Sequence, residues 1–390
     1  MQQEIYLDNS ATTKPSPGVI QAVVECMEII YGNPSSAHRK GLEAERVITR
    51  SREALAAVLK ADPKQIIFTS GGTESDNLAI KGVASSYSNR GKHIITMAIE
   101  HPAVLNACRD LEREGFEVTY LPVDREGVIQ VEDLEEALRE DTILVSTMYV
   151  NNEIGSVQPL LEIAKVIKKA KTTGKLPLWH VDAVQALGRL PLFPAETGID
   201  LVSLSAHKVH GPKGIGALYV GKGVTLHPQI AGGGQEGDLR SGTENVPGIA
   251  GFGAAAGELD KAGGSAAEHM AALRRMLVEG VMESIPGCRL NGPPPGSPYA
   301  APHIANISFK GIRGEVLLHW LEGEGIYAST GSACSSRKHV GNGVLKALGL
   351  REEEAQGALR FSFSPDNGVE QVETVLRKLK EGVKELRNFA

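Results

Sequence analysis

Short apolar runs alternate with helical segments through residues 65–220, and this alternation limits the folds open to the chain. The runs at 65–68, 93–99, 117–123, 142–150, 176–181, 201–204 and 216–220 have the length and composition of buried strands. Helical patterns of apolar residues lie between them, as at 159–171, and a further helix is expected before them at 42–59. Repeated strand–helix units joined by short turns predict an α/β fold, with a mainly parallel sheet that is covered by helices on both faces.

The pattern changes after the glycine-rich stretch 231–237. A long helical stretch is expected at 246–285, followed by a Pro/Gly cluster at 291–302 and by strands near 303–309, 326–329 and 359–363. A chain of 390 residues can bury more than one core. We expect a large domain over 15–260 and a smaller α+β domain made of 1–14 and 261–390.

Composition narrows the classes of protein. The formal charge of -6 is mild, and the basic residues are scattered, so neither a nucleic-acid surface nor a membrane span is indicated. Four cysteines without Cys-x-x-Cys spacing argue against a disulfide framework and against a structural metal site. The start of the chain lacks a basic region followed by an apolar one, so we expect a cytoplasmic protein.

Two strand ends carry residues that point to carbonyl chemistry. Lys208 follows the apolar run 201–204, and Asp182 lies where the run 178–181 stops. Desolvation beyond a buried strand favours the neutral amine, which forms an imine with a carbonyl compound, whereas a solvated surface lysine is the ordinary alternative. A lysine that binds an aldehyde and an acid that faces a pyridine nitrogen are what pyridoxal phosphate requires of a protein.

Three motifs together resemble the cysteine desulfurases, which are pyridoxal-phosphate enzymes of the class V aminotransferase type. They are Ser205-Ala206-His207-Lys208, His180-Val181-Asp182-Ala183-Val184-Gln185 and the segment Thr-Ser-Gly-Gly-Thr-Glu-Ser-Asp-Asn at 69–77. The resemblance runs from Leu7-Asp8-Asn9-Ser10-Ala11-Thr12-Thr13 to Arg360-Phe361-Ser362. It implies the aminotransferase fold (fold type I), with a mainly parallel, seven-stranded sheet in the large domain, and it implies pyridoxal 5'-phosphate as the cofactor.

The glycine loop after the strand at 65–68 is a candidate anion site. A strand, then Gly71-Gly72-Thr73, then a helix present backbone N–H groups, a hydroxyl and a helix dipole to an anion, although a plain tight turn has the same pattern. The resemblance implies that the cofactor phosphate is held by Gly72, Thr73, Ser205 and His207. In that family a threonine from the partner subunit completes the phosphate site, and Thr243 matches it, which implies a homodimer.

The resemblance also assigns roles around the cofactor ring. His101 would stack on the ring and move protons, Asp182 would keep the ring nitrogen protonated, and Gln185 would contact the phenolic oxygen. Asn152 would lie beside the cofactor and the substrate carboxylate, and Arg360 would clamp that carboxylate. Without the resemblance, His101 could simply cap a helix, Asn152 could belong to a turn, and Arg360 could form an ordinary ion pair.

Cys334 differs from the other cysteines in its surroundings. Cys26 and Cys108 lie in apolar helical patterns and are expected to be buried, and Cys288 follows a Pro-Gly turn. The segment 330–339 around Cys334 is small and polar, with three basic residues that would stabilise a thiolate. The family's nucleophilic cysteine matches Cys334, which would take sulfur from cysteine as a persulfide and release alanine. Flanking glycines predict a mobile loop that holds its thiol away from Lys208.

The resemblance implies that the chain acts on L-cysteine and passes the sulfur to an acceptor protein. The sequence leaves the acceptor open between an iron-sulfur scaffold and a tRNA-thiolating enzyme. Selenocysteine lyase or an aminotransferase would share Lys208 and Asp182 without needing Cys334. A non-enzymatic sulfur carrier would keep Cys334 but could dispense with Lys208, Asp182 and His101, so their joint presence favours an enzyme.

Overall fold

A central seven-stranded sheet forms the larger part of the molecule. The computed structural model describes residues 4–171, 176–262, 264–330 and 343–388. The strand order is β2-β8-β7-β6-β5-β3-β4. The bounds are β2 Ile66–Thr69, β3 His93–Met97, β4 Glu117–Leu121, β5 Thr142–Met148, β6 Leu178–Asp182, β7 Leu201–Ser205 and β8 Gly216–Val220. Only β8 runs antiparallel to its neighbours, so the predicted α/β class and mainly parallel sheet are confirmed.

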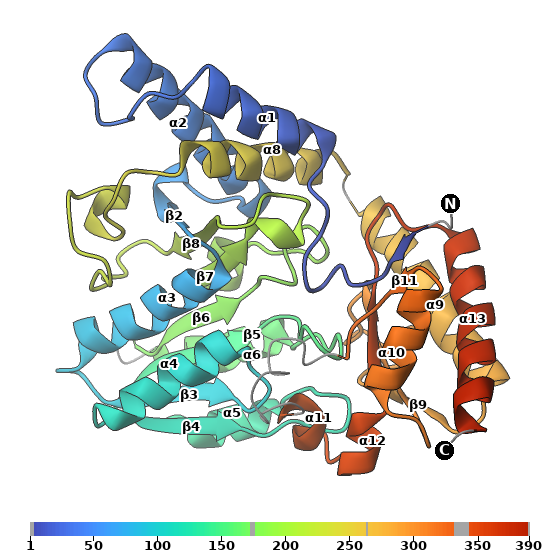
Figure 1. The fold of residues 1–390 in the computed structure, drawn as a ribbon. Helices are drawn as coiled ribbons and strands as arrows, with labels where there is room; N and C mark the ends of the chain where they lie inside the picture. The colour runs from blue at the N-terminus through green and yellow to red at the C-terminus, as the bar shows by residue number, and fades with distance from the viewer. Residues whose placement is uncertain (1–3, 172–175, 263, 331–342, 389–390) are drawn as a thin grey trace.

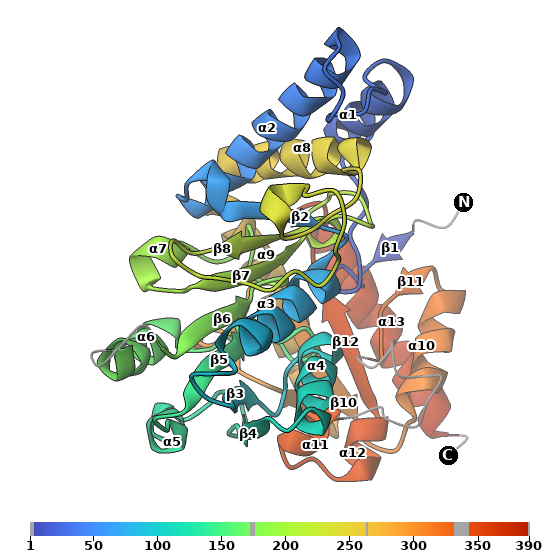
Figure 2. The same cartoon turned by 90° about the vertical axis from the view of Figure 1, so that its left-hand side faces the viewer.

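Both faces of this sheet are buried, because its strands carry apolar side chains at successive positions. In β2, Ile66 and Phe68 belong to one core cluster, whereas Ile67 between them belongs to another. Helices α3 (Gly72–Tyr87) and α4 (Pro102–Arg113) cover the face of Ile67. Helices α2 (Arg39–Leu59) and α6 (Leu160–Ala170) lie on the opposite face (Figure 2). The period-2 alternation of a strand therefore divides the core between two helical layers.

Helix α8 (Val246–Ala262) packs against both α1 (Pro17–Glu28) and α2 beside β2 and β8 (Figure 1). Ser16 caps α1 by accepting a hydrogen bond from the Val19 amide at 3.2 Å, and Pro17 occupies the first helical position. The remaining short elements of this part are α5 (Val131–Ala137), α7 (Pro194–Thr197) and the 3-10 turns η1 (Pro63–Gln65), η3 (Ala206–Lys208) and η4 (Glu236–Asp238).

A separate core joins the two ends of the chain. The antiparallel sheet of β9 (Cys288–Asn291), β10 (Ile304–Phe309) and β12 (Ala358–Ser362) packs with α9 (Ser265–Ser284), α10 (Gly314–Gly323) and α13 (Val369–Arg387) (Figure 1). Strand β1 (Ile5–Tyr6) pairs in parallel with β11 (Ile326–Tyr327) and contributes Ile5 to this core. The short helices α11 (Gly343–Ala347) and α12 (Glu352–Gln356) precede β12. The division of the chain near residue 260 stays a prediction.

One local expectation was wrong, and one strand was not predicted. The stretch 246–285 is not one helix, since α8 ends at Ala262 and α9 begins at Ser265. Glycine is a poor residue for a helix interior, and Gly264 occupies the N-cap of α9. Cys288 follows the Pro-Gly turn as expected and begins the strand β9, which was not predicted and which pairs with β10 through Cys288 and Phe309.

No helix in the described part of the chain is long and apolar enough to cross a membrane. Across the same residues, His, Cys, Asp and Glu form no group of three that could hold a metal ion.

Candidate active site

Predicted site residues from several strands meet at one edge of the seven-stranded sheet. Strands β2, β3, β5, β6 and β7 all run in one direction, so their carboxyl ends lie along the same edge. The last residues of these strands and the segments that follow them carry Gly72 and Thr73, His101, Asn152, Asp182, and Ser205 to Lys208. Ligands of open α/β sheets bind at this edge, and here the topology collects these residues from a stretch of 137 positions (72–208).

The amino end of α3 lies against the ends of β6 and β7. Gly71 has a φ of +155°, a value that side chains rarely tolerate, and α3 begins at Gly72. A Cβ atom on Gly72 would lie 2.7 Å from Val184 Cγ2 and 3.8 Å from Ser205 Cβ. The glycine therefore allows the helix to start beside Ser205. Thr73 is exposed in the first turn, where the backbone N–H groups and the helix dipole favour an anion.

His207 and Lys208 follow β7 in the turn η3. His207 Nδ1 lies 3.2 Å from Thr12 Oγ1, and burial lowers the pKa of His207 to about 4, with Lys208 acting in the same direction. Lys208 Nζ donates to the carbonyl oxygens of Ser10 and Ala11, at 2.5 and 2.7 Å. Its own carbonyl accepts from Arg189 Nη2 at 2.6 Å, which fixes the backbone of the lysine. The lysine amine is thus held at the sheet edge by the amino-terminal segment.

Asp182 ends β6 as a buried carboxylate. Its Oδ1 accepts a hydrogen bond from the Val184 amide at 3.0 Å. Burial raises the pKa of Asp182, and the nearby His101 and Lys208 oppose that shift. Burial lowers the pKa of His101 and favours its neutral form, and His101 Nδ1 accepts from the Ala103 amide at 3.1 Å as the N-cap of α4. His101 therefore caps a helix and also lies within electrostatic reach of Asp182 and Lys208.

Two further buried acids surround Asp182, and sequence reasoning missed both. Asp76 on α3 is 1% exposed, and Glu100, beside His101, is 2% exposed. Burial and the neighbouring Asp182 raise the pKa of both carboxyl groups well above their usual range. Glu100 Oε1 accepts from the Met148 amide at 2.5 Å, while its Oε2 is buried with no partner in the described part of the chain. The cluster favours neutral Asp76 and Glu100 around Asp182.

Gln185 lies between the amino-terminal segment and β10. Its Nε2 donates to the Ser10 carbonyl at 2.9 Å, and its Oε1 lies 3.3 Å from Nε2 of the buried His303. Burial lowers the pKa of His303 well below its usual value, and nearby arginines add to that effect, so a neutral imidazole is favoured. Ser10 therefore contacts both Gln185 and Lys208. No sequence signal singled out His303.

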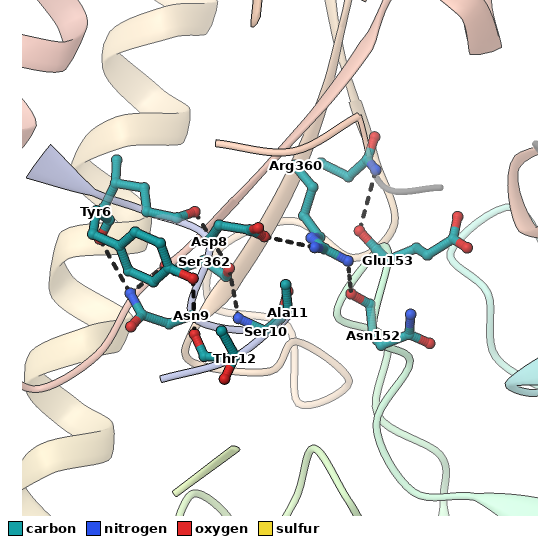
Figure 3. Close-up of polar contacts among 12 residues, drawn as sticks. Tyr6, Asp8, Asn9, Ser10, Ala11, Thr12, Asn152, Glu153, Arg360 and Ser362 are labelled. Carbon is teal, nitrogen blue, oxygen red and sulfur yellow. Dashed lines mark hydrogen bonds and ion pairs between the residues drawn. The ribbon is translucent and has the colours of Figure 1, made fainter. Parts of the chain in front are cut away.

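Arg360 reaches this edge from β12 in the second core. Figure 3 shows its guanidinium between Asp8 and Asn152. Nη2 donates to Asp8 Oδ1 at 2.7 Å, and Nη1 donates to the Asn152 carbonyl at 3.0 Å. The structure brings Arg360 and Asn152 together. Their roles toward a substrate carboxylate stay predictions. The sequence motif that contains Asp8 did not predict its contact with Arg360, which only the tertiary structure shows.

Two predicted residues are not joined to this group. Thr243 is exposed and lines a cavity of about 150 Å³ with Ser70 and Arg240. Its predicted contact involves a partner subunit. Cys334 lies outside the described residues, so its distance from Lys208 and the mobility of its loop stay predictions. Of the other cysteines, Cys26 and Cys108 are buried as expected.

The residues present fit pyridoxal phosphate. A buried carboxylate, a lysine amine at a strand end and the amino end of a 16-residue helix offer partners for a pyridine nitrogen, an aldehyde and a phosphate. The model of the class-V aminotransferase family matches residues 5–375. The chain therefore belongs to the class-V aminotransferases, and it is a pyridoxal-phosphate-dependent enzyme.

Comparison with individual proteins narrows the family. A cysteine desulfurase IscS of Dictyoglomus turgidum is 44% identical over 394 residues, which cover 100% of this chain and 97% of that protein. The structure of a NifS-like protein is 41% identical, with a TM-score of 0.91 over 98% of this chain and 100% of that chain. The structure of SspA in complex with cysteine is 36% identical, with a TM-score of 0.80 over 93% of this chain and 99% of that chain. Within its class the chain belongs to the cysteine desulfurases.

Proposed function

We propose that this chain removes sulfur from L-cysteine, retains it on Cys334 as a persulfide and passes it to an acceptor protein. The observation that carries the proposal is the meeting of Lys208, Asp182 and His101 at one sheet edge, with Arg360 reaching the same edge from the second core. An aminotransferase would need no nucleophilic cysteine, so Cys334 favours desulfuration. The bound cofactor supplies an electron sink for reactions at the carbon atoms of an amino acid.

The protein's own residues have distinct tasks in this proposal. Lys208 attaches the cofactor, and Asp182 keeps its pyridine nitrogen protonated. Gly72, Thr73, Ser205 and His207 hold the phosphate, and Gln185 donates to the phenolic oxygen. His101 stacks on the ring, and as a neutral imidazole it accepts and returns protons. Arg360 and Asn152 orient the substrate carboxylate.

Cys334 completes the reaction as the nucleophile. Its thiolate forms a bond to the sulfur of the substrate while the carbon–sulfur bond of the substrate breaks. In sum, L-cysteine and the Cys334 thiol give L-alanine and the Cys334 persulfide, with atoms and electrons balanced. Either an iron-sulfur scaffold or a tRNA-thiolating enzyme would then accept the sulfur.

A homodimer and a cytoplasmic location form part of the proposal. Helix α1 exposes Ile20 (51%), Val24 (43%) and Met27 (66%), which share one face at helical spacing. Such an apolar stripe on a monomer surface marks an interaction site, and we assign a second copy of this chain to it. The three described cysteines are free thiols, which supports a reducing compartment.

The test adds L-cysteine to the purified yellow protein and assays alanine together with protein persulfide. The parent protein should form both, and Cys334→Ala should keep the cofactor and bind cysteine without releasing alanine. Cys288→Ala is the matched control and should behave as the parent. Persulfide on Cys26, Cys108 or Cys288 in a Cys334→Ala protein that turns over at the parent rate would show that the nucleophile is assigned wrongly.

A further inference from the structure

Arg360 has an anionic partner of its own within this chain. The arginine side chain is 4% exposed, and the Asp8 side chain paired with it is 18% exposed. Their 2.7 Å contact is a charge-assisted hydrogen bond, which is stronger than a neutral one. The backbone after Asp8 is hydrogen-bonded to β12, which holds Asp8 in place. Asn9 Nδ2 donates to the Ser362 carbonyl at 2.9 Å, and the Ser10 amide donates to Ser362 Oγ at 2.8 Å.

The guanidinium nevertheless has unused donors. Of its five N–H groups, one points to Asp8 and one to the Asn152 carbonyl, and Nε is buried with no partner among the described residues. A substrate carboxylate that used the remaining donors would not have to displace Asp8. The substrate carboxylate and the Asp8 carboxylate would then both interact with the positive charge of Arg360.

We propose that Asp8 is a positioning and affinity-setting residue, which holds the Arg360 guanidinium and weakens its attraction for the substrate carboxylate. The inference rests on the proposed function, because it assumes that Arg360 receives the carboxylate of an amino acid. Two carboxylates on one guanidinium lie about 5 Å apart, and their repulsion changes affinity between about fourfold and a few hundredfold for effective dielectric constants of about 80 to 20. Weaker binding favours release of the product, which carries the same carboxylate.

A pair of ligands isolates this effect in the cofactor-loaded protein. L-Alanine carries a carboxylate, whereas ethylamine is alanine without it. Each is titrated while the absorbance of the bound cofactor is followed, which gives a dissociation constant without any turnover. Asp8→Asn removes the charge of Asp8 but keeps an oxygen that can accept from Arg360. The matched control is Asp366→Asn, which removes one negative charge from an exposed residue beyond β12.

Asp8→Asn should lower the dissociation constant of L-alanine by at least about fourfold. The dissociation constant of ethylamine should not change, and Asp366→Asn should leave both ligands at their parent values. If Asp8→Asn only damaged the structure of the site, both L-alanine and ethylamine would bind more weakly. Tighter binding of L-alanine alone therefore indicates an effect of the Asp8 charge on the carboxylate.

The possible failures are distinguishable. A parent protein that gives no absorbance change with L-alanine contradicts the proposed function and this inference with it. A parent protein that responds, combined with an Asp8→Asn variant that binds L-alanine equally or more weakly, overturns the inference alone. An equal gain for ethylamine also overturns it, because the charge of Asp8 would then act on something other than the carboxylate.

Discussion

At the scale of single residues, three buried carboxyl groups of the site differ in their electrostatic surroundings. Asp182 lies near His101 and Lys208, whose influence opposes the effect of burial on the pKa of Asp182. Burial and the charge of Asp182 raise the pKa values of Asp76 and Glu100 well above the usual range. Asp182 is therefore the carboxyl group of this cluster whose charged form is favoured by nearby cations.

We expect Asp182→Asn to weaken cofactor binding by roughly 10- to 100-fold, since a charge-assisted hydrogen bond contributes about 1.5–3 kcal/mol. Glu100→Gln is the matched control. It should bind the cofactor with nearly parent affinity, because an amide oxygen can still accept from the Met148 amide, and burial raises the pKa of the native carboxyl group well above its usual range. The dissociation constant of the cofactor is measured by titrating each apoprotein with pyridoxal phosphate and following the absorbance. Equal losses in the two variants would contradict the assignment.

Lys208→Ala should abolish the absorbance that arises when the lysine amine binds the cofactor aldehyde, because the amine held by Ser10 and Ala11 is lost. Borohydride treatment followed by mass spectrometry measures covalent attachment. Lys213→Ala, which removes an exposed lysine five positions later, is the control and should keep both signals. Covalent attachment of the cofactor to the Lys208→Ala protein would show that Lys208 is not the residue that binds the cofactor aldehyde.

At the scale of elements, the start of α3 depends on a close approach to β6 and β7. Gly72→Ala places a Cβ about 2.7 Å from Val184 Cγ2, so the helix or the turn after Asp182 must shift. We expect weaker binding of the cofactor, by roughly tenfold or more, because a displacement of about 1 Å costs up to about a hundredfold at a positioned site.

Gly257→Ala is the matched change within α8, where a Cβ meets no atom within 4 Å. Alanine is the better helix former, so this variant should unfold at a higher urea concentration, with a gain of about 0.5–1 kcal/mol and unchanged cofactor affinity. Urea denaturation and cofactor titration of both variants test the pair. Unchanged cofactor affinity in Gly72→Ala would show that the start of α3 tolerates a side chain.

At the scale of the whole molecule, the apolar face of α1 has no covering element in the described part of the chain. Met27→Lys should disrupt the proposed dimer and reduce cofactor affinity, because the partner's Thr243 would no longer reach the phosphate. Sedimentation velocity measures the association. Leu161→Lys, at an equally exposed apolar position on α6 (66%), is the control and should remain dimeric. A fully active monomer of the parent protein would exclude the shared site.

Much of this molecule could be predicted from local sequence patterns. Strand and helix periods indicated the alternating elements of the large sheet, and the positions of Asp182, Lys208 and Asn152 at strand ends placed them on one edge. These predictions succeed because the period of a strand or helix and the direction of parallel strands are local properties. The strand β9 shows the limit, since its four residues Cys-Arg-Leu-Asn have little apolar character and form a strand through their pairing with β10.

Only the tertiary structure decided the environment of each site residue. Asp8 and Arg360 are separated by 352 positions, yet they form an ion pair. Ser10 contacts Lys208 and Gln185, and His303 reaches Gln185 from another strand. The burial of Asp76, Glu100 and Asp182 in one cluster likewise sets their pKa shifts. Charges and hydrogen bonds depend on distance in space and on exclusion of water, and neither quantity is encoded in local periodicity.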